Sequence, residues 1–406
     1  MRRSVLYAVC GFFWLLMVPA AAQRGESPSS GPPADDPIKA LAGRLELERY
    51  KATVKGLTQF GDRRQGTDRN RAAVDWIEAQ LKSYGCPTDR IKYEYQPPAT
   101  QGRGGAGRGA GGGRGPDQAQ GGGRLRGIRA RTGVNTDPMM QPDVTLRELN
   151  MQATTPGPRE MVYCTKAGTS HADEMYIVGA HMDGHGWGEA ANDDGSGTAL
   201  VMELARVFSM RDVETERSIR FALWNNEETG SQAARAYIAQ RGPMQGQEDP
   251  PGSGRYPEPR WLGMVQHDMM MFDHGMPRAD GSMSKEQRPE ADVNIEFQMS
   301  SKTAPESQKL AWLFEAANEK YATDYPAAVG SHMTNTDSGP FQDLIPAISL
   351  RENERGEQIG AGWDPQWHQP TDLFATYTDK DFRLGLNAAQ TTLGAVAQLT
   401  GATVKK

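Results

Sequence analysis

From residue 160 onward, short apolar segments alternate with longer amphipathic ones, and this alternation limits the possible folds more than any other feature of the chain. Short apolar segments of this kind predict buried strands, and longer segments with apolar residues at helical spacing predict helices. We expect strands at residues 160–164, 174–180, 218–223, 261–265, 294–298 and 347–350, and helices at 197–210, 230–240, 308–321 and 379–399. Strands that alternate with helices form a mostly parallel sheet. The predicted fold is therefore α/β, with a mostly parallel mixed sheet covered by helices on both faces.

Two further helices are expected before this region, at residues 44–59 and 67–85. The second has apolar residues at helical spacing, with Thr67 as a possible N-cap and Gly85 as a stop signal. Two insertions rich in Pro and Gly, at residues 241–260 and 275–288, interrupt the alternating pattern. We expect them to be long loops, and such loops often lie near a cleft.

The N-terminal segment has the features of an export signal. Arg2 and Arg3 precede an apolar stretch at residues 5–18, and Ala20 and Ala22 are placed as in a cleavage site. The stretch is shorter than the roughly 20 residues that cross a bilayer, so no stable membrane anchor is expected. We expect residues 1–22 to be a signal peptide, 23–43 a flexible leader and 44–400 the folded domain of a periplasmic or extracellular protein.

The composition argues against a nucleic-acid partner. Of the twenty-two residues at 102–123, twelve are Gly, so we expect a disordered Gly/Arg-rich loop at 101–127. The loop has no aromatic residues that could stack on RNA bases. The chain as a whole carries a formal net charge of -6, which also disfavours binding to RNA. No nucleic-acid partner is expected.

Cys86 and Cys164 remain after the signal is removed, and the sequence alone does not decide whether they are bonded.

Histidines and carboxylates follow several of the predicted strands. They are His181, Asp183, Asp193, Glu227, Glu228, Asp268 and, further on, His368. The carboxyl ends of parallel strands meet at one edge of a sheet, where active sites are usually built. A two-metal hydrolase needs His and carboxylate ligands, one bridging carboxylate and a free carboxylate as base. Each residue alone has an ordinary structural explanation, but the series within one α/β pattern favours a metal site.

Four segments then resemble a known family, the exported co-catalytic dizinc aminopeptidases, whose wider family includes glutamate carboxypeptidase II and the transferrin receptor. The segments are Gly-Ala-His-Met-Asp at 179–183, Asn-Asp-Asp-Gly-Ser-Gly at 192–197, Asn-Glu-Glu-Thr-Gly-Ser at 226–231 and Trp-His-Gln-Pro-Thr-Asp at 367–372. The resemblance extends over roughly residues 47–399. It implies the zinc-exopeptidase fold and two Zn²⁺ ions per chain.

The resemblance also implies a role for each matched residue. Asp193 is similar to the bridging carboxylate, and the family's Asp-x-x-Ser-Gly spacing selects it over Asp194. By the same matching, His181 and Asp268 complete one zinc site, while Glu228 and His368 complete the other. Glu227 resembles the general base, and Asp183 resembles the carboxylate that orients His181.

Some positions depart from the family pattern or lie outside it. Ser338 stands where many members have His, and Trp367 stands where some have a Tyr able to donate to the substrate oxyanion. The remaining histidines are expected at the surface or in loops, with the last two named the most able to reach the cleft: His171, His185, His274, His267 and His332.

The function that the resemblance implies is removal of N-terminal residues from peptides by an exported metallo-aminopeptidase. Two alternatives share the fold: a carboxypeptidase and a glutaminyl cyclase-like acyltransferase. A third is a non-catalytic, receptor-like ectodomain. All five ligand types are present in this chain, which argues against a single-zinc enzyme and against a receptor-like protein that has lost its ligands. Two zinc ions per chain would favour the peptidase, and no zinc would favour the receptor-like protein.

Overall fold

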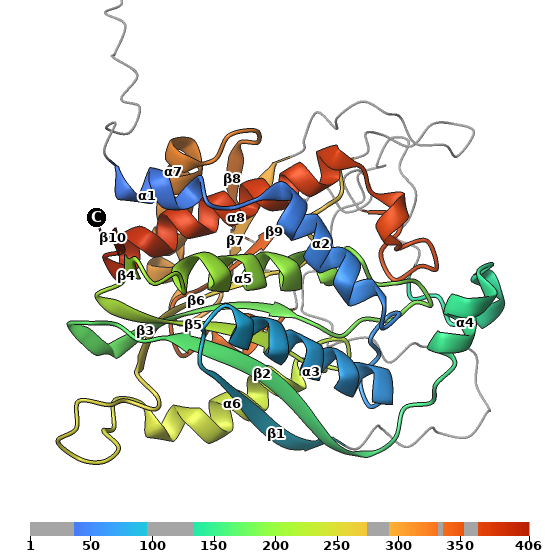
Figure 1. Ribbon diagram of the computed structural model, residues 1–406, viewed down its shortest axis with the longest axis horizontal. Helices are drawn as coiled ribbons and strands as arrows, with labels where there is room; N and C mark the ends of the chain where they lie inside the picture. The colour runs from blue at the N-terminus through green and yellow to red at the C-terminus, as the bar shows by residue number, and fades with distance from the viewer. Residues whose placement is uncertain (1–35, 96–132, 274–291, 332–335, 353–363, 406) are drawn as a thin grey trace, which may run out of the picture.

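The computed structural model describes residues 36–95, 133–273, 292–331, 336–352 and 364–405 (Figure 1). The expected signal peptide, most of the leader, the Gly/Arg-rich loop and the insertion at 275–288 lie outside these ranges. Within them, no helix combines the length and apolar character needed to cross a membrane.

An eight-stranded mixed sheet runs through the centre of the molecule (Figure 1). In sheet order its strands are β1 (Thr88–Tyr95), β2 (Gly157–Lys166), β5 (Arg217–Trp224), β3 (His171–His181), β6 (Arg260–His267), β9 (Ala347–Arg351), β7 (Val293–Phe297) and β8 (Ala327–Gly330). The four central strands β5, β3, β6 and β9 are parallel to one another. Their carboxyl ends therefore lie at one edge. Two short strands, β4 (Val213–Glu214) and β10 (Thr403–Val404), form a separate ribbon.

Helices pack on both faces of the sheet, as the sequence predicts. In β5, Phe221 and Leu223 point into the larger core, and Ala222 and Trp224 point into the smaller one. The larger core is covered by α1 (Pro37–Ala42), α2 (Leu47–Thr58), α3 (Asp68–Ser83), α5 (Gly195–Phe208), α7 (Ala304–Tyr321) and α8 (Asp379–Thr400). The smaller core is covered by α6 (Gln232–Arg241), on the opposite side in Figure 1. Short helices are α4 (Val144–Asn150), η2 (Pro138–Met140), η3 (Gly242–Met244), η4 (Gly339–Phe341) and η5 (Phe374–Thr376).

Each strand and helix expected from the sequence is present, with ends shifted by a few residues. The predicted start and stop signals of α3 are confirmed. The Thr67 side chain accepts a hydrogen bond from the Asn70 N–H, and Gly85 follows the helix with φ of 81°. This positive φ favours Gly, because it has no Cβ to clash with the backbone.

The ordered part of the chain begins earlier than expected. Residues 37–42 form α1 rather than the end of a flexible leader, because Leu41 and Ala42 are buried in the larger core and the Asp36 side chain caps the helix. The insertion at 241–260 also differs from expectation. It joins the end of α6 to the start of β6, so it lies at the edge of the sheet opposite the carboxyl ends of the central strands, away from the candidate site (Figure 1).

The two cysteines left open by the sequence are joined by a disulfide bond, with an S–S distance of 2.15 Å. Cys86 lies just before β1, and Cys164 lies within β2, opposite Thr88. Both sulfur-bearing side chains are buried in the larger core. The bond therefore ties the outer strand β1 to the sheet.

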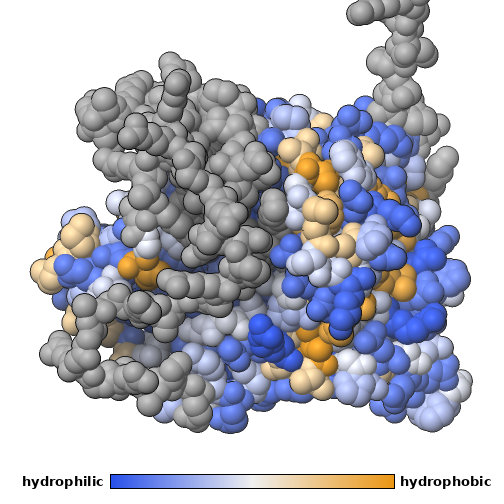
Figure 2. Space-filling view, turned by 180° about the vertical axis from the view of Figure 1, so that it is seen from behind, coloured by the Kyte–Doolittle hydropathy of each residue, from blue (hydrophilic) through white to orange (hydrophobic). Residues whose placement is uncertain are grey.

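Hydrophobic residues on the molecular face of Figure 2 form small separate patches among hydrophilic ones. One group of exposed hydrophobic side chains gathers around η2 and α4: Val134, Met139, Met140, Val144, Leu149 and Met151. The segment that carries them is attached to the loop of His368, because the Asn135 N–H donates to the His368 carbonyl oxygen.

Candidate metal centre

Three neighbouring parallel strands deliver the candidate residues to one edge of the sheet. His181 is the last residue of β3, and Asp268 comes directly after β6. Glu227 and Glu228 follow β5 after two asparagines. The register pairs His181 with Trp224, so these strand ends lie side by side. The predicted convergence at the carboxyl edge is therefore present.

The first group of metal-type donors surrounds His181. Its Nε2 lies 3.2 Å from Asp193 Oδ1 and 3.8 Å from Asp268 Oδ1. The other carboxylate oxygen of Asp268 accepts from Arg351 Nη2 at 2.7 Å. Arg351 is buried, so it holds one oxygen of Asp268 in place and leaves the other directed toward His181.

The second group surrounds His368. Its Nε2 lies 2.9 Å from Asp193 Oδ2 and 3.0 Å from Glu228 Oε2. Asp193 thus presents one oxygen to each imidazole. This is the arrangement of a carboxylate shared by two adjoining sites.

His185 joins the second group, although the sequence analysis expects it at the surface or in a loop and does not count it among the ligands. Its Nε2 lies 3.0 Å from Glu228 Oε2, and its ring meets the His368 ring edge to face at 4.0 Å. The residue lies in the irregular segment between β3 and α5, outside the matched motifs. The only signal in the sequence is its position between Gly184 and Gly186.

Asp183 contacts His181 through its main chain rather than through its carboxylate. The His181 Nδ1 lies 2.9 Å from the Asp183 carbonyl oxygen and 3.9 Å from the carboxylate oxygen Oδ1. A carbonyl oxygen only accepts, so Nδ1 carries the proton and Nε2 is left facing Asp193. The Asp183 carboxylate instead accepts from the Glu227 N–H at 3.0 Å, and it thereby links the predicted base to β3.

A buried network supports the backbone of the shared carboxylate. Asp372 accepts from the N–H groups of Asn192 and Asp193 at 2.8 and 3.1 Å. The Tyr377 hydroxyl oxygen lies 3.0 Å from a carboxylate oxygen of Asp372 and 3.0 Å from one of Asp364, so it hydrogen-bonds within this pair. Burial raises the pKa of Asp364 to about 6, and burial with the nearby Asp364 charge raises the pKa of Asp372 to about 7.

The pKa shifts at the centre show that the buried carboxylates stabilise positive charge on the neighbouring histidines. Although burial alone favours neutral imidazole, the charges of Asp194 and Asp193 raise the pKa of His181, and Glu228 and Asp193 raise the pKa of His368 to about 9. The pKa of Asp193 is lowered by the same imidazoles, despite its burial. In the metal-free protein, protons on histidine therefore offset the buried carboxylates. A cation bound by deprotonated donors would do the same, so the residues fit a metal site.

Glu227 is half-buried and stands apart from these contacts. Burial is the main cause that raises its pKa well above the usual range, and the neighbouring charges of Glu228 and Asp337 add to the effect. A carboxylate with a raised pKa holds a proton more readily near neutral pH, as a general base must after it has accepted one.

The other histidines and the two variant positions have separate places. His171 is exposed at the start of β3, as predicted. His267 is buried instead, with Nδ1 near the Gly179 carbonyl oxygen and Nε2 near Thr392 Oγ1, so it faces α8. His274 and His332 lie outside the described residues. Ser338 pairs with Ser349, and the Trp367 ring stacks on the His368 ring at 3.7 Å.

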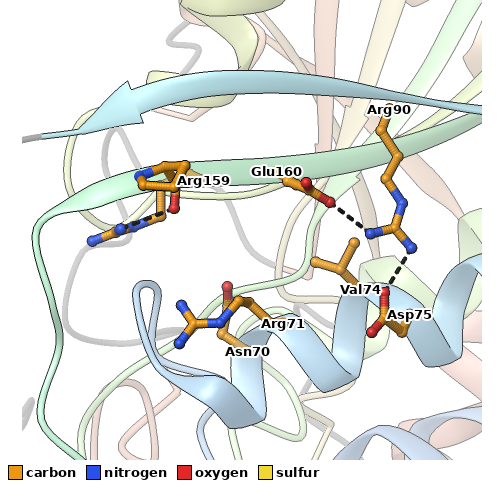
Figure 3. Close-up of a pocket in the computed structure, with 8 residues that line it drawn as sticks. Asn70, Arg71, Val74, Asp75, Arg90, Arg159 and Glu160 are labelled. Atoms are coloured by element: carbon orange, nitrogen blue, oxygen red, sulfur yellow. Dashed lines mark hydrogen bonds and ion pairs between the residues drawn. The ribbon is translucent and has the colours of Figure 1, made fainter.

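A separate pocket of about 220 Å³ lies between α3 and the outer strands β1 and β2 (Figure 3). Arg90, on its wall, donates to Glu160 and Asp75. Arg159 donates to Gln65 and to main-chain carbonyl oxygens. Both of these arginines thus have partners within the protein. None of the candidate site residues lines this pocket.

The fold and the donors together define an α/β protein with two adjoining groups of metal-type donors at the carboxyl edge of its sheet. Residues 161–390 match peptidase family M28, which is more than half of the chain. The chain belongs to this family.

Comparisons with individual proteins agree with that assignment. Aminopeptidase YwaD of Bacillus subtilis is 37% identical over 68 residues, which are 17% of this chain and only 14% of that protein. The solved structure of BSAP, a zinc aminopeptidase from Bacillus subtilis, matches with a TM-score of 0.59 at 16% identity, over 89% of this chain and 96% of that one. Porphyromonas gingivalis glutaminyl cyclase matches with a TM-score of 0.54 at 16% identity, over 88% of this chain and 99% of that one. At these identities the structural likeness shows the fold alone.

Proposed function

We propose that this protein is an exported zinc aminopeptidase that binds two zinc ions and removes N-terminal residues from peptides. The observation that carries the proposal is the placement of Asp193, whose two oxygens face His181 on one side and His368 on the other. A relative named as an aminopeptidase, 37% identical over 68 residues, supports the same activity.

The proposed ligands divide into two sets that share Asp193. His181 and Asp268 would hold one ion, and Glu228 and His368 the other. Imidazole and carboxylate donors with positions open to water suit catalytic zinc. When bound, zinc lowers the pKa of water to about 7 and polarises a carbonyl group.

Glu227 is the proposed general base. Its backbone N–H is held by the Asp183 carboxylate, and its side chain is half-buried beside Glu228. In the proposed reaction Glu227 accepts a proton from the attacking water and delivers a proton to the nitrogen of the leaving amine. The C–N bond of the first peptide link breaks, and the first residue is released with a new carboxylate.

Charge at the centre favours a free N-terminus over a free C-terminus. Besides the proposed ligands, whose charges the bound ions offset, the carboxylates of Glu227 and Asp337 lie close to the centre, so a substrate ammonium group has acidic partners there, whereas a substrate carboxylate needs a cationic partner. Arg351 does not supply one, because its side chain is 2% exposed and already bound to Asp268. The glutaminyl cyclase reaction remains the second candidate, on the basis of the shared fold.

Export is part of the proposal. Residues 1–22 have the composition of a signal peptide. The Cys86–Cys164 disulfide supports an oxidising location outside the cytosol, where such bonds persist.

Metal analysis of the purified mature protein tests whether it binds the two zinc ions that the proposed reaction requires. Two zinc ions per chain, with loss of peptide cleavage on chelation and recovery with zinc, are the expected results. A chain that binds no metal while folded would contradict the proposed function and favour the receptor-like alternative.

A further inference from the structure

We propose that His185 is an additional ligand of the zinc ion held by Asp193, Glu228 and His368, so that this ion has four protein donors. The inference rests on the proposed two-metal function and deepens it. The motifs that match the family do not include His185, and the sequence analysis assigns it no role beyond a surface or loop residue.

The position of the ring is the first argument. His185 Nε2 and His368 Nε2 each lie 3.0 Å from the same oxygen, Glu228 Oε2. Donor atoms that share a zinc ion at about 2.0–2.1 Å are roughly 3 Å apart. The two imidazole nitrogens and the Glu228 carboxylate offer donor atoms that all lie within 4.8 Å of one another.

The state of the nitrogen is the second argument. His185 Nε2 is buried, and among the described residues no hydrogen bond of acceptable geometry reaches it. A buried polar atom without a hydrogen bond is destabilising unless another partner takes its place. A metal ion between His185, Glu228 and His368 would provide that partner.

The backbone on either side of His185 is the third argument. Gly186 has φ of 102°, and a Cβ at this position would lie 2.4 Å from the main-chain carbon of His368. A Cβ on Gly184 would lie 2.8 Å from the Asp193 carbonyl oxygen. Only residues without a side chain allow such contact, so the two glycines let this segment press against both neighbouring ligands and bring His185 to the ion.

The consequence is an asymmetric pair of metal sites. The site around His181 has one imidazole and two carboxylates, counting the shared Asp193. The site around His368 would have two imidazoles and two carboxylates, so fewer of its positions stay open to water and substrate. We expect the ion at this second site to be the more tightly held of the two.

Metal binding tests the inference without reference to activity. The variants are His185→Ala and His185→Asn, and the matched control is His171→Ala, which removes an exposed histidine at the start of β3, at the opposite end of that strand from His181. Metal-free wild type and variants are titrated with zinc in competition with a chromophoric chelator. X-ray absorption of the zinc-loaded proteins then counts imidazole ligands. Equal melting temperatures of the metal-free forms show that folding is retained.

In both His185 variants we expect the zinc affinity of one of the two sites to fall by ~10–100-fold or more. Removal of a residue that only hydrogen-bonds to a metal ligand already lowers metal affinity by about that factor. The absorption data should show three imidazoles shared by two zinc ions in wild type and in the control, and two imidazoles in the variants. Two zinc ions bound with unchanged affinity and an unchanged imidazole count would overturn the role of His185 alone. Failure of the wild type to bind zinc would overturn the proposed function together with it.

Discussion

Asp193 and Asp194 are adjacent in the chain, yet their carboxylates serve different parts of the molecule. Asp193 faces the two imidazoles His181 and His368. Asp194 accepts from the N–H groups of His181, Gly197 and Met269, and so caps α5 and ties it to β3 and to the segment after β6. In the proposed assignment Asp193 binds metal, whereas Asp194 holds together the elements that surround the centre.

Replacing each of these two aspartates separately should separate the two roles. Asp193→Asn should lower zinc content while the metal-free protein keeps its melting temperature. Asp194→Ala should destabilise even the metal-free fold by about 1–3 kcal/mol, because a helix cap and buried hydrogen bonds are lost. Denaturant unfolding and metal analysis of the metal-stripped and zinc-loaded forms provide the comparison. Equal behaviour of both variants would refute the division of labour.

Glu227 and Glu228 form a second informative pair. Glu227→Gln should keep both zinc ions and lower kcat by roughly 10²–10⁴-fold, since general acid–base catalysis contributes that much. Glu228→Gln should lose metal as well as turnover. The assignment of the base fails if both variants lose metal to the same extent.

The disulfide should contribute strongly to stability. It joins residues separated by 78 positions, and removal of a native disulfide typically destabilises a secreted domain by about 2–5 kcal/mol. The double variant Cys86→Ser, Cys164→Ser should unfold at clearly lower urea concentration than the oxidised wild type. Reduced wild type is the control and should match the variant. An unchanged midpoint would mean that β1 is held by its other contacts.

The buried pair Asp364 and Asp372 should make stability depend on pH. Their folded pKa values are raised to about 6 and about 7 from the usual 3.8, mainly by burial. The folded state therefore binds more protons than the unfolded state between about pH 4 and 7, so these groups destabilise the fold as pH rises through that window. Asp364→Asn removes one group and lowers the pKa of the other. Metal-stripped Asp364→Asn should lose less melting temperature than metal-stripped wild type between pH 4.5 and 7.5. Parallel curves would contradict the pKa assignment.

The sequence predicts most of the central architecture because its strands are buried on both sides and therefore read as continuous apolar runs. The outer strand β1 was missed, since only Ile91 is buried in it and the charged residues Arg90, Lys92 and Glu94 alternate with it. The short strand β8 is only partly buried and has no clear pattern. Local periodicity carries little information about such edge strands, whose place depends on a partner far along the chain.

The site could be predicted where its residues follow strands or fall in recognised motifs. His181, Asp193, Glu228, Asp268 and His368 meet as expected. His185 was missed because it lies in an irregular segment whose path depends on contacts of Gly184 and Gly186 with distant backbone. The network of Asp364 and Asp372 was missed for a similar reason. Burial of a carboxylate is set by tertiary packing, and a single Asp in a polar segment does not reveal it.

Cleavage of one short peptide in three forms tests the central claim most directly. The peptide is offered free, N-acetylated and C-amidated to the zinc-loaded protein, with Glu227→Gln as the inactive control, and product masses are followed over time. The account predicts stepwise shortening from the N-terminus of the free and amidated forms while the acetylated form stays intact. Removal of C-terminal residues, or loss of water or ammonia without cleavage, would contradict it.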